Sequence, residues 1–77
     1  MTYPEIDILN EKAKSRKDGI YSYKTYFYAV KNNRFIAFTN YFGECYQRMG
    51  GFNVSIGNMP NRFIAKDKLK EWLKCQK

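Results

Sequence analysis

The first residues of the chain show a helical spacing of apolar side chains, whereas the middle of the chain alternates. Ile6, Leu9 and Ala13 lie at helical spacing, and acidic residues precede basic ones, which suits the helix dipole. Residue types typical of a helix start come just before them: Thr2, Pro4 and Glu5. The pattern predicts a first helix that ends at residues 17–19, where glycine can adopt positive φ.

Residues 20–38 are rich in Tyr, Phe and β-branched side chains and predict two strands that are joined at Asn32 and Asn33. Asparagine tolerates the left-handed conformation that a two-residue hairpin turn requires. The expected pairs are Lys31 with Arg34, Val30 with Phe35, Ala29 with Ile36, Tyr28 with Ala37 and Phe27 with Phe38.

Strand alternation assigns each side chain of this hairpin to one face. One face is apolar and is expected to be core: Phe27, Ala29, Ile36 and Phe38. The other is amphipathic: Lys24, Tyr26, Tyr28, Val30 and Phe35. Two interpretations of the amphipathic face stay open, namely an exposed platform and packing beneath another element.

The second half of the chain changes its period. The spacing of Phe42, Cys45, Tyr46 and Met49 favours a helix over residues 41–49. Glycine within that segment weakens a helix, so a bent strand is the alternative.

The rest of the chain follows after two glycines. Residues 52–56 alternate and predict a strand, and residues 62–65 are ambiguous, with a fourth strand as one option. Residues 66–75 place Leu69, Trp72 and Leu73 on one stripe and predict the last helix.

These elements predict an α+β fold in the order α-β-β-α-β-α. We expect a small three-stranded antiparallel sheet with the helices packed on the face that carries Phe27 and Phe38. Because the chain has 77 residues, a single basic domain over residues 1–77 is expected.

The composition argues against an enzyme. Histidine is absent and the seven acidic residues are scattered, so no serine or cysteine has an evident base beside it. Cys45 and Cys75 alone cannot complete a tetrahedral zinc site. We therefore expect no catalytic residue, no cofactor, no bound metal and no small-molecule substrate.

The sequence also predicts where the protein acts. It contains no apolar run of about 18 residues and no basic start followed by an apolar core. These absences predict a cytoplasmic protein without a membrane partner, whose two cysteines stay reduced.

The charge balance is the strongest functional feature. Lys and Arg number 14 against seven acids, which gives a formal charge of +7 and favours nucleic acid or an acidic protein as the partner. The candidate nucleic-acid-binding residues are Arg16, Lys17, Lys24, Tyr26, Tyr28, Lys31 and Arg34. The cations would contact phosphates, the two tyrosines would stack on bases, and Arg34 at the turn would contact a phosphate or a base.

A second set of cations, Lys66, Lys70, Lys74 and Lys77, forms a stripe on the predicted last helix. A lysine stripe beside an apolar stripe is more typical of a solvated helix face than of a phosphate site.

Two stretches resemble the arm-type DNA-binding domain of tyrosine integrases from mobile elements. They are residues 16–24, with the sequence RKDGIYSYK, and residues 63–73, which end in Glu71, Trp72 and Leu73. The resemblance implies a three-stranded sheet, backed by a C-terminal helix, that lies in the DNA major groove. It implies that Lys24, Tyr26, Tyr28 and Arg34 face the groove. The predicted helices before residue 16 and over residues 41–49 depart from that family.

The leading hypothesis is a nucleic-acid-binding protein, with DNA more favoured than RNA, that is encoded by a phage or mobile element. The residue usage, rich in Lys, Asn, Ile, Phe and Tyr, is typical of the AT-rich genomes of many phages. The alternative is a small phage-type modulator or inhibitor that binds an acidic host or defence protein, because Tyr and Arg are enriched in protein interfaces. Both a monomer and a homodimer through the tyrosine face are compatible with the sequence.

Overall fold

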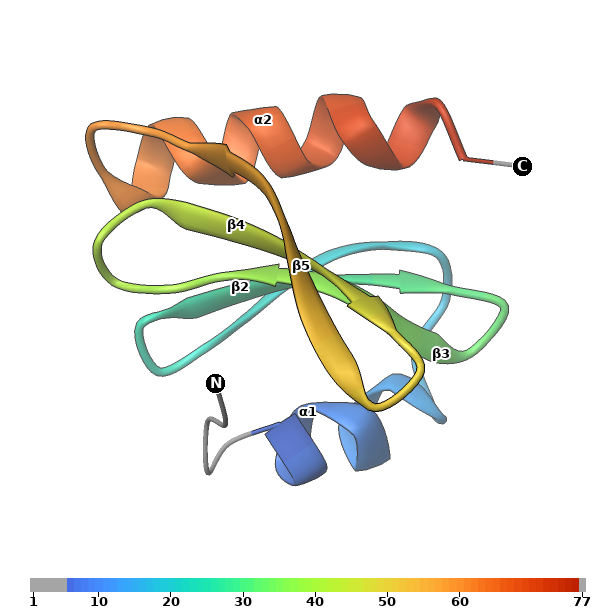
Figure 1. The fold of residues 1–77 in the computed structure, drawn as a ribbon. Coiled ribbons are helices and arrows are strands. Elements are labelled where there is room, and N and C mark those ends of the chain that lie inside the picture. Colours follow the sequence, from blue (N-terminus) through green and yellow to red (C-terminus); the bar gives the residue numbers. More distant parts are fainter. Residues whose placement is uncertain (1–5, 77) are drawn as a thin grey trace.

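The computed structural model describes residues 6–76 and shows one antiparallel sheet between two helices (Figure 1). The five strands lie side by side in chain order, β1-β2-β3-β4-β5. The elements are α1 (Ile6–Ala13), β1 (Gly19–Tyr23), β2 (Tyr26–Lys31), β3 (Arg34–Thr39), β4 (Glu44–Met49), β5 (Phe52–Asn58) and α2 (Arg62–Lys74). The α+β class is as predicted, but the prediction of three strands is wrong. The proposed helix start at Thr2, Pro4 and Glu5 lies outside the described residues.

One of the additional strands arises because residues 20–30 form two strands instead of one. Lys24 and Thr25 form a two-residue turn between Tyr23 and Tyr26, which pair with each other. Lys24 adopts a φ of 55°, which is the left-handed conformation. Lysine is not a typical residue for this conformation, so the sequence does not predict a turn here. Because β-forming residues lie on both sides of this turn, the sequence pattern predicts one continuous strand.

The other additional strand is β4, which replaces the helix predicted over residues 41–49. Asn40 fixes the turn that precedes it, because its side-chain oxygen accepts hydrogen bonds from the backbone N–H groups of Phe42 and Glu44, each at 3.0 Å. The chain is thereby directed into β4, which pairs with β3 on one side and β5 on the other. Sheet pairing therefore overrides the helical spacing, and the bent-strand alternative was the correct one.

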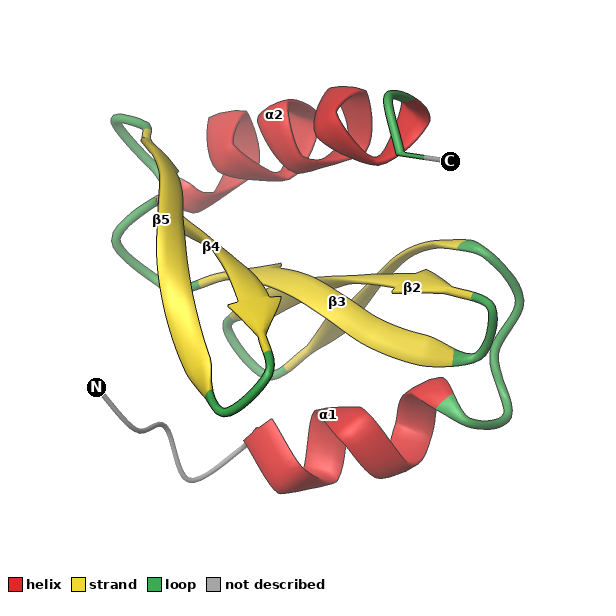
Figure 2. Cartoon of the chain, turned by 45° about the vertical axis from the view of Figure 1, so that its right-hand side comes forward, coloured by secondary structure: helices red, strands yellow, loops and turns green. Residues whose placement is uncertain are grey.

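The two helices cover opposite faces of the sheet, which corrects the expectation that they share one face (Figure 2). Leu9 and Ala13 of α1 pack against a cluster that contains Tyr28 and Phe38. Leu69 of α2 packs on the other face. Both faces of the central strands carry apolar residues, so each face requires a cover.

The central hairpin confirms the predicted turn and corrects the register beyond it. Asn32 and Asn33 have φ values of 54° and 60°, as a two-residue turn with two left-handed positions requires. The pairs of Lys31 with Arg34 and Val30 with Phe35 are confirmed.

A β-bulge then shifts the register between Val30 and Ala29, so that Ala29 pairs with Ala37 and Tyr28 with Phe38. Because a one-residue shift moves side chains to the other face, Phe38 joins Tyr28 on the α1 side. The predicted face with Phe27, Ala29, Ile36 and Phe38 is therefore wrong at Phe38.

The last helix begins four residues earlier than predicted, since residues 62–65 are its first turn and not a fourth strand. The Asn61 side chain accepts hydrogen bonds from the N–H groups of Phe63 and Ile64, each at 3.0 Å. Such a cap satisfies donors that the first turn of a helix leaves unpaired. Among residues 6–76, neither α1 nor α2 has the length and apolar character needed to cross a membrane.

Gly43 in the β3–β4 turn generates a stability prediction. It has a φ of 90°, its carbonyl accepts a hydrogen bond from Met59 N at 2.8 Å, and a Cβ there would lie 2.9 Å from the Asn61 carbonyl oxygen and still closer to that of Met59. We predict that Gly43→Ala lowers the free energy of unfolding by about 3 kcal/mol or more, through backbone strain and this clash. Urea unfolding measures the change.

Gly50→Ala is the matched control. Gly50 also has a positive φ, 64°, but no atom lies within 4 Å of the position of a Cβ. The Gly50→Ala substitution should lower the free energy of unfolding by about 1–2 kcal/mol, through conformational strain alone. Equal losses for the two variants would contradict the steric argument.

Candidate nucleic-acid interface

Four of the predicted cations lie at the tip of the β2–β3 hairpin or in the loop that is tied to it, and we call them the tip cluster: Arg16, Lys17, Lys31 and Arg34. The loop after α1 is tied to the hairpin turn by two hydrogen bonds. Asn33 Nδ2 donates to the Arg16 carbonyl at 2.8 Å, and Asn32 N donates to Asp18 Oδ1 at 2.9 Å. These bonds bring the loop cations beside Lys31 and Arg34, which pair across the two strands.

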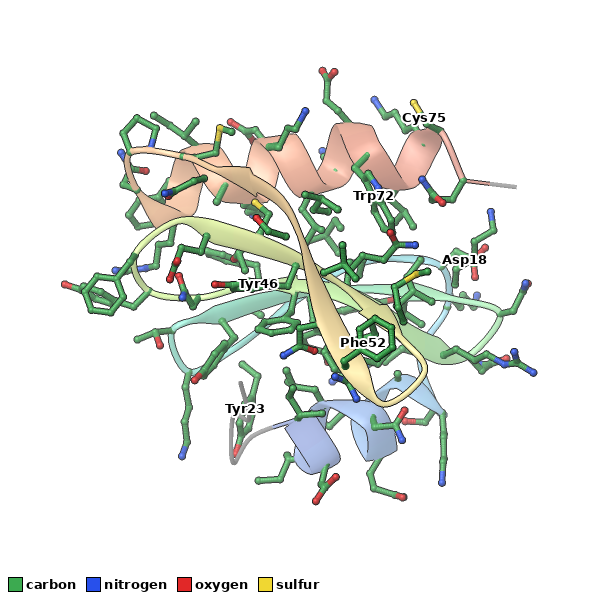
Figure 3. All side chains as sticks on the ribbon, viewed as in Figure 1. Asp18, Tyr23, Tyr46, Phe52, Trp72 and Cys75 are labelled. Atoms are coloured by element: carbon green, nitrogen blue, oxygen red, sulfur yellow. The ribbon has the colours of Figure 1, made fainter. Side chains whose placement is uncertain are left out.

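The tip cluster also adjoins the C-terminal end of α2. Lys31 Nζ donates a hydrogen bond to the Gln76 carbonyl at 2.8 Å, so this lysine is half-buried and fixed in place. Lys31 and Arg34 line a hollow together with Arg48 of β4 and Trp72 of α2. Figure 3 shows Trp72 pointing from α2 toward the sheet, and Asp18 near the same end of the molecule.

Arg48 is a cation that the sequence analysis did not single out. It donates a hydrogen bond to Asn53 Oδ1 and lines the hollow beside Arg34. The strand alternative for residues 41–49, had it been preferred, would have placed Arg48 in a sheet.

The lysines of α2 form a second basic feature, which we call the basic groove. Lys66, Lys70 and Lys74 line a groove with Leu73 of α2 and with Gly19 and Ile20 of β1. β1 is an edge strand of the sheet. Sequence spacing identified the lysine stripe, but only the fold places it against this open edge. Lys77 lies outside the described residues.

The predicted tyrosine platform is covered by α1, so that prediction needs a correction. Tyr28 is fully buried, and its ring lies 5.8 Å from that of Tyr21 and 6.2 Å from that of Phe35. Tyr26 is half-buried, with its ring 6.3 Å from that of Phe38. The covered interpretation of this face is therefore the correct one, and Tyr28 has no exposed ring face to offer a base.

Lys24 lies at the other end of the sheet from the tip cluster. It occupies the β1–β2 turn, and the six residues of β2 separate that turn from the β2–β3 turn by about 20 Å. Its Nζ lies 5.6 Å from the centre of the Tyr23 ring, which also has Lys12 Nζ at 5.1 Å. The seven predicted residues thus do not form one site.

Within residues 6–76 no cation of the tip cluster or the basic groove forms a salt bridge with a carboxylate, although the Asp18 carboxylate lies in the loop of the tip cluster. The salt bridge found among residues 6–76 joins Lys14 Nζ to the Glu11 carboxylate on α1, at 2.9 Å. Unpaired cations on so small a surface create a positive potential that attracts anionic polymers.

The two cysteines have different surroundings. Cys45 is buried, with its Sγ 3.7 Å from the Ala65 carbonyl oxygen. Burial raises the pKa of the Cys45 thiol, and the nearby Lys68 ammonium offsets this only in part. Cys75 is exposed at the end of α2 (Figure 3). In the described part of the chain, no three His, Cys, Asp or Glu side chains come together as metal ligands would.

Comparisons with protein-family models, with curated proteins and with solved structures gave no match to this chain. The resemblance to integrase arm-type domains therefore stays a prediction, and function has to be argued from geometry and charge.

The cysteine environments predict selective labelling. At pH 8 an alkylating reagent should modify Cys75 in the folded protein and leave Cys45 unmodified, because a buried thiol with a raised pKa stays protonated and is not nucleophilic. Peptide mass spectrometry identifies the modified residue. Both thiols should react after denaturation, and native modification of Cys45 would contradict its burial.

The buried Tyr28 hydroxyl predicts an unusual response to mutation. It has no hydrogen-bond partner within the described structure, so Tyr28→Phe should raise the free energy of unfolding by about 1 kcal/mol. Tyr21→Phe is the control, because Tyr21 OH donates to the Lys17 carbonyl at 2.9 Å and its removal should cost about 1 kcal/mol. Thermal unfolding distinguishes the two signs, and a loss of stability in Tyr28→Phe would disprove the assignment.

Proposed function

We propose that this protein binds nucleic acid through one basic surface that joins the basic groove to the tip cluster. The observation that carries the proposal is the groove itself, in which three lysines of α2 face an open edge strand. Lys31 connects the two features because it bonds to Gln76, two residues after Lys74. Lys17 connects them on the other side because it precedes Gly19, which lines the groove.

The spacing of the groove lysines suits a charged backbone. Residues four apart on a helix are separated by about 6 Å along its axis, so Lys66, Lys70 and Lys74 place three ammonium groups along about 12 Å. Each lysine acts as a point charge on a flexible stem. Such a row favours sequence-independent phosphate contacts, whose affinity comes largely from the release of counterions.

The fold argues against insertion of the β2–β3 hairpin as a ribbon into a DNA groove. β2 is flanked by β1 and β3 is flanked by β4, and both faces of the pair are covered by helices. The arrangement that remains is one in which the nucleic acid contacts the hairpin tip and the basic groove.

A charge-matched comparison tests the proposal. We expect Lys70→Ala with Lys74→Ala to weaken binding to a DNA probe about 10-fold or more and to reduce the salt slope by about 2, one for each lost phosphate contact. The control is Lys14→Ala with Lys68→Ala, which removes the same charge outside the groove and the tip cluster and should change affinity by less than about 3-fold. Fluorescence anisotropy over a salt series measures both quantities.

Two results would overturn the proposal. One is the absence of binding to duplex and single-stranded probes of DNA and RNA at about 50 mM salt. The other is an equal loss of affinity in the groove variant and the control, which would show that net charge alone determines binding.

A protein partner is the second candidate, and an exposed apolar patch on the β4–β5 hairpin favours it. Met49, Phe52 and Val54 are 44%, 63% and 39% exposed, and Figure 3 shows Phe52 on this hairpin. Clustered exposed apolar side chains are typical of protein interfaces. A stoichiometric partner that stays bound to the tagged protein after nuclease treatment, and is lost in Phe52→Ala, would support this function.

A further inference from the structure

Three aromatic side chains stand exposed at the end of the molecule opposite the tip cluster, and we call them the aromatic patch: Tyr41, Phe42 and Phe63. Their exposed fractions are 53%, 72% and 60%. Tyr41 and Phe42 occupy the β3–β4 turn, and Phe63 lies in the first turn of α2. They belong to neither of the two apolar clusters that cover the sheet.

The three rings and the Arg62 guanidinium form a connected set. The Arg62 guanidinium lies 4.9 Å from the centre of the Tyr41 ring and 4.7 Å from that of Phe63. The rings of Tyr41 and Phe42 meet edge to face, with centres 5.4 Å apart. The arrangement resembles the rings and cations of a surface that holds both the bases and the phosphates of a nucleic acid.

The fold does not require these rings. The β3–β4 turn is fixed by the Asn40 side chain and by Gly43, whose bonds to the backbone use no aromatic group. Turns are usually occupied by Gly, Asn, Asp, Ser or Pro, which satisfy the backbone or adopt its special conformations. Two consecutive exposed aromatic residues in this turn contribute little to the stability of the fold, so binding of a ligand explains their presence better than packing does.

The patch and the basic groove are continuous. Lys66 lines the groove, and its Nζ also lies 5.2 Å from the centre of the Phe27 ring, which in turn lies 6.3 Å from that of Phe63. The acidic residues of α2, Asp67 and Glu71, are not among the residues that line the groove. From Arg62 to Lys74 the helix extends about 18 Å.

We infer that the aromatic patch stacks on unpaired bases, so that the preferred ligand of this surface is single-stranded nucleic acid whose backbone follows the basic groove. The inference rests on the proposed nucleic-acid binding and names the class of ligand. Bases in a duplex are stacked on each other and expose no ring face, whereas a single strand can place its bases on aromatic side chains. The cations beside the rings favour this ligand over an uncharged apolar peptide.

The test compares single-stranded and duplex DNA of equal length. We expect the unmodified protein to bind the single strand about 10-fold tighter or more, since each base that stacks on a ring adds affinity. Phe42→Ala with Phe63→Ala should remove this preference and leave duplex binding within about 2-fold. An abasic single strand, which keeps the phosphates and lacks the bases, should bind the unmodified protein no better than the duplex does.

The control variant is Phe52→Ala, which removes an equally exposed phenylalanine on the β4–β5 hairpin, away from the patch. It should keep the preference for single strands. Circular dichroism confirms that each variant is folded, and the high exposure of the substituted rings predicts that it will be.

The outcomes separate this inference from the proposal on which it rests. Equal affinity for single strand and duplex, or a preference that survives in the double variant, overturns the role of the aromatic patch while nucleic-acid binding stands. Absence of binding to every probe overturns both. An equal loss of affinity for single strands in Phe52→Ala and in the double variant also contradicts the inference, because the effect would then not be specific to the aromatic patch.

Discussion

The packing of α2 onto two facing alanines is the constraint on which the rest of this structure depends. Ala29 and Ala37 pair directly across β2 and β3, are fully buried, and lie beneath Leu69. Their small side chains let the helix approach the centre of the sheet, whereas a larger residue at either position would force it away. The bulge beside Ala29 makes this pairing possible, since the unbulged register would oppose Ala29 with Ile36.

The opposite face shows the consequence of that arrangement. The bulge sends Phe38 to the α1 side, where it packs with Tyr28 and Tyr46, the latter with its ring centre 5.4 Å away. A chain this short has a thin core, and the cluster that α1 covers is rich in large aromatic rings, among them Tyr28, Phe35 and Phe38. The tyrosines that the sequence suggests as a binding surface pack against α1, and the proposed nucleic-acid surface consists of lysines, arginines and rings elsewhere on the molecule.

Local features of the sequence were sufficient for some elements and misleading for others. The Asn32 and Asn33 turn, the first helix and the apolar stripe of the last helix follow from local conformational preference, and all three are present. The predicted end of the first helix at residues 17–19 is wrong, because α1 ends at Ala13 and Gly19 begins β1. The helix prediction for residues 41–49 is wrong because their helical spacing is also compatible with a twisted strand. Only the pairing with β3 and β5 decides between helix and strand. For the candidate site, the positions of Lys31 and Arg34 at the hairpin tip could be predicted because they flank one turn, whereas only the structure brings the loop of Arg16 and Lys17 to that turn. The aromatic patch could not, because Tyr41 and Phe63 are distant in sequence.

The sequence by itself determined the charge of the protein, its lack of histidine and the turn at Asn32 and Asn33, since these depend on composition and on neighbouring residues. Only the tertiary structure decided which aromatic residues are core and which are surface. That choice depends on the bulge, on the side of the sheet that each helix covers, and on the meeting of the β3–β4 turn with the start of α2. The bulge depends on the pairing of two strands, and the other two are contacts between segments distant in sequence, so burial is decided by these contacts and not by residue type alone.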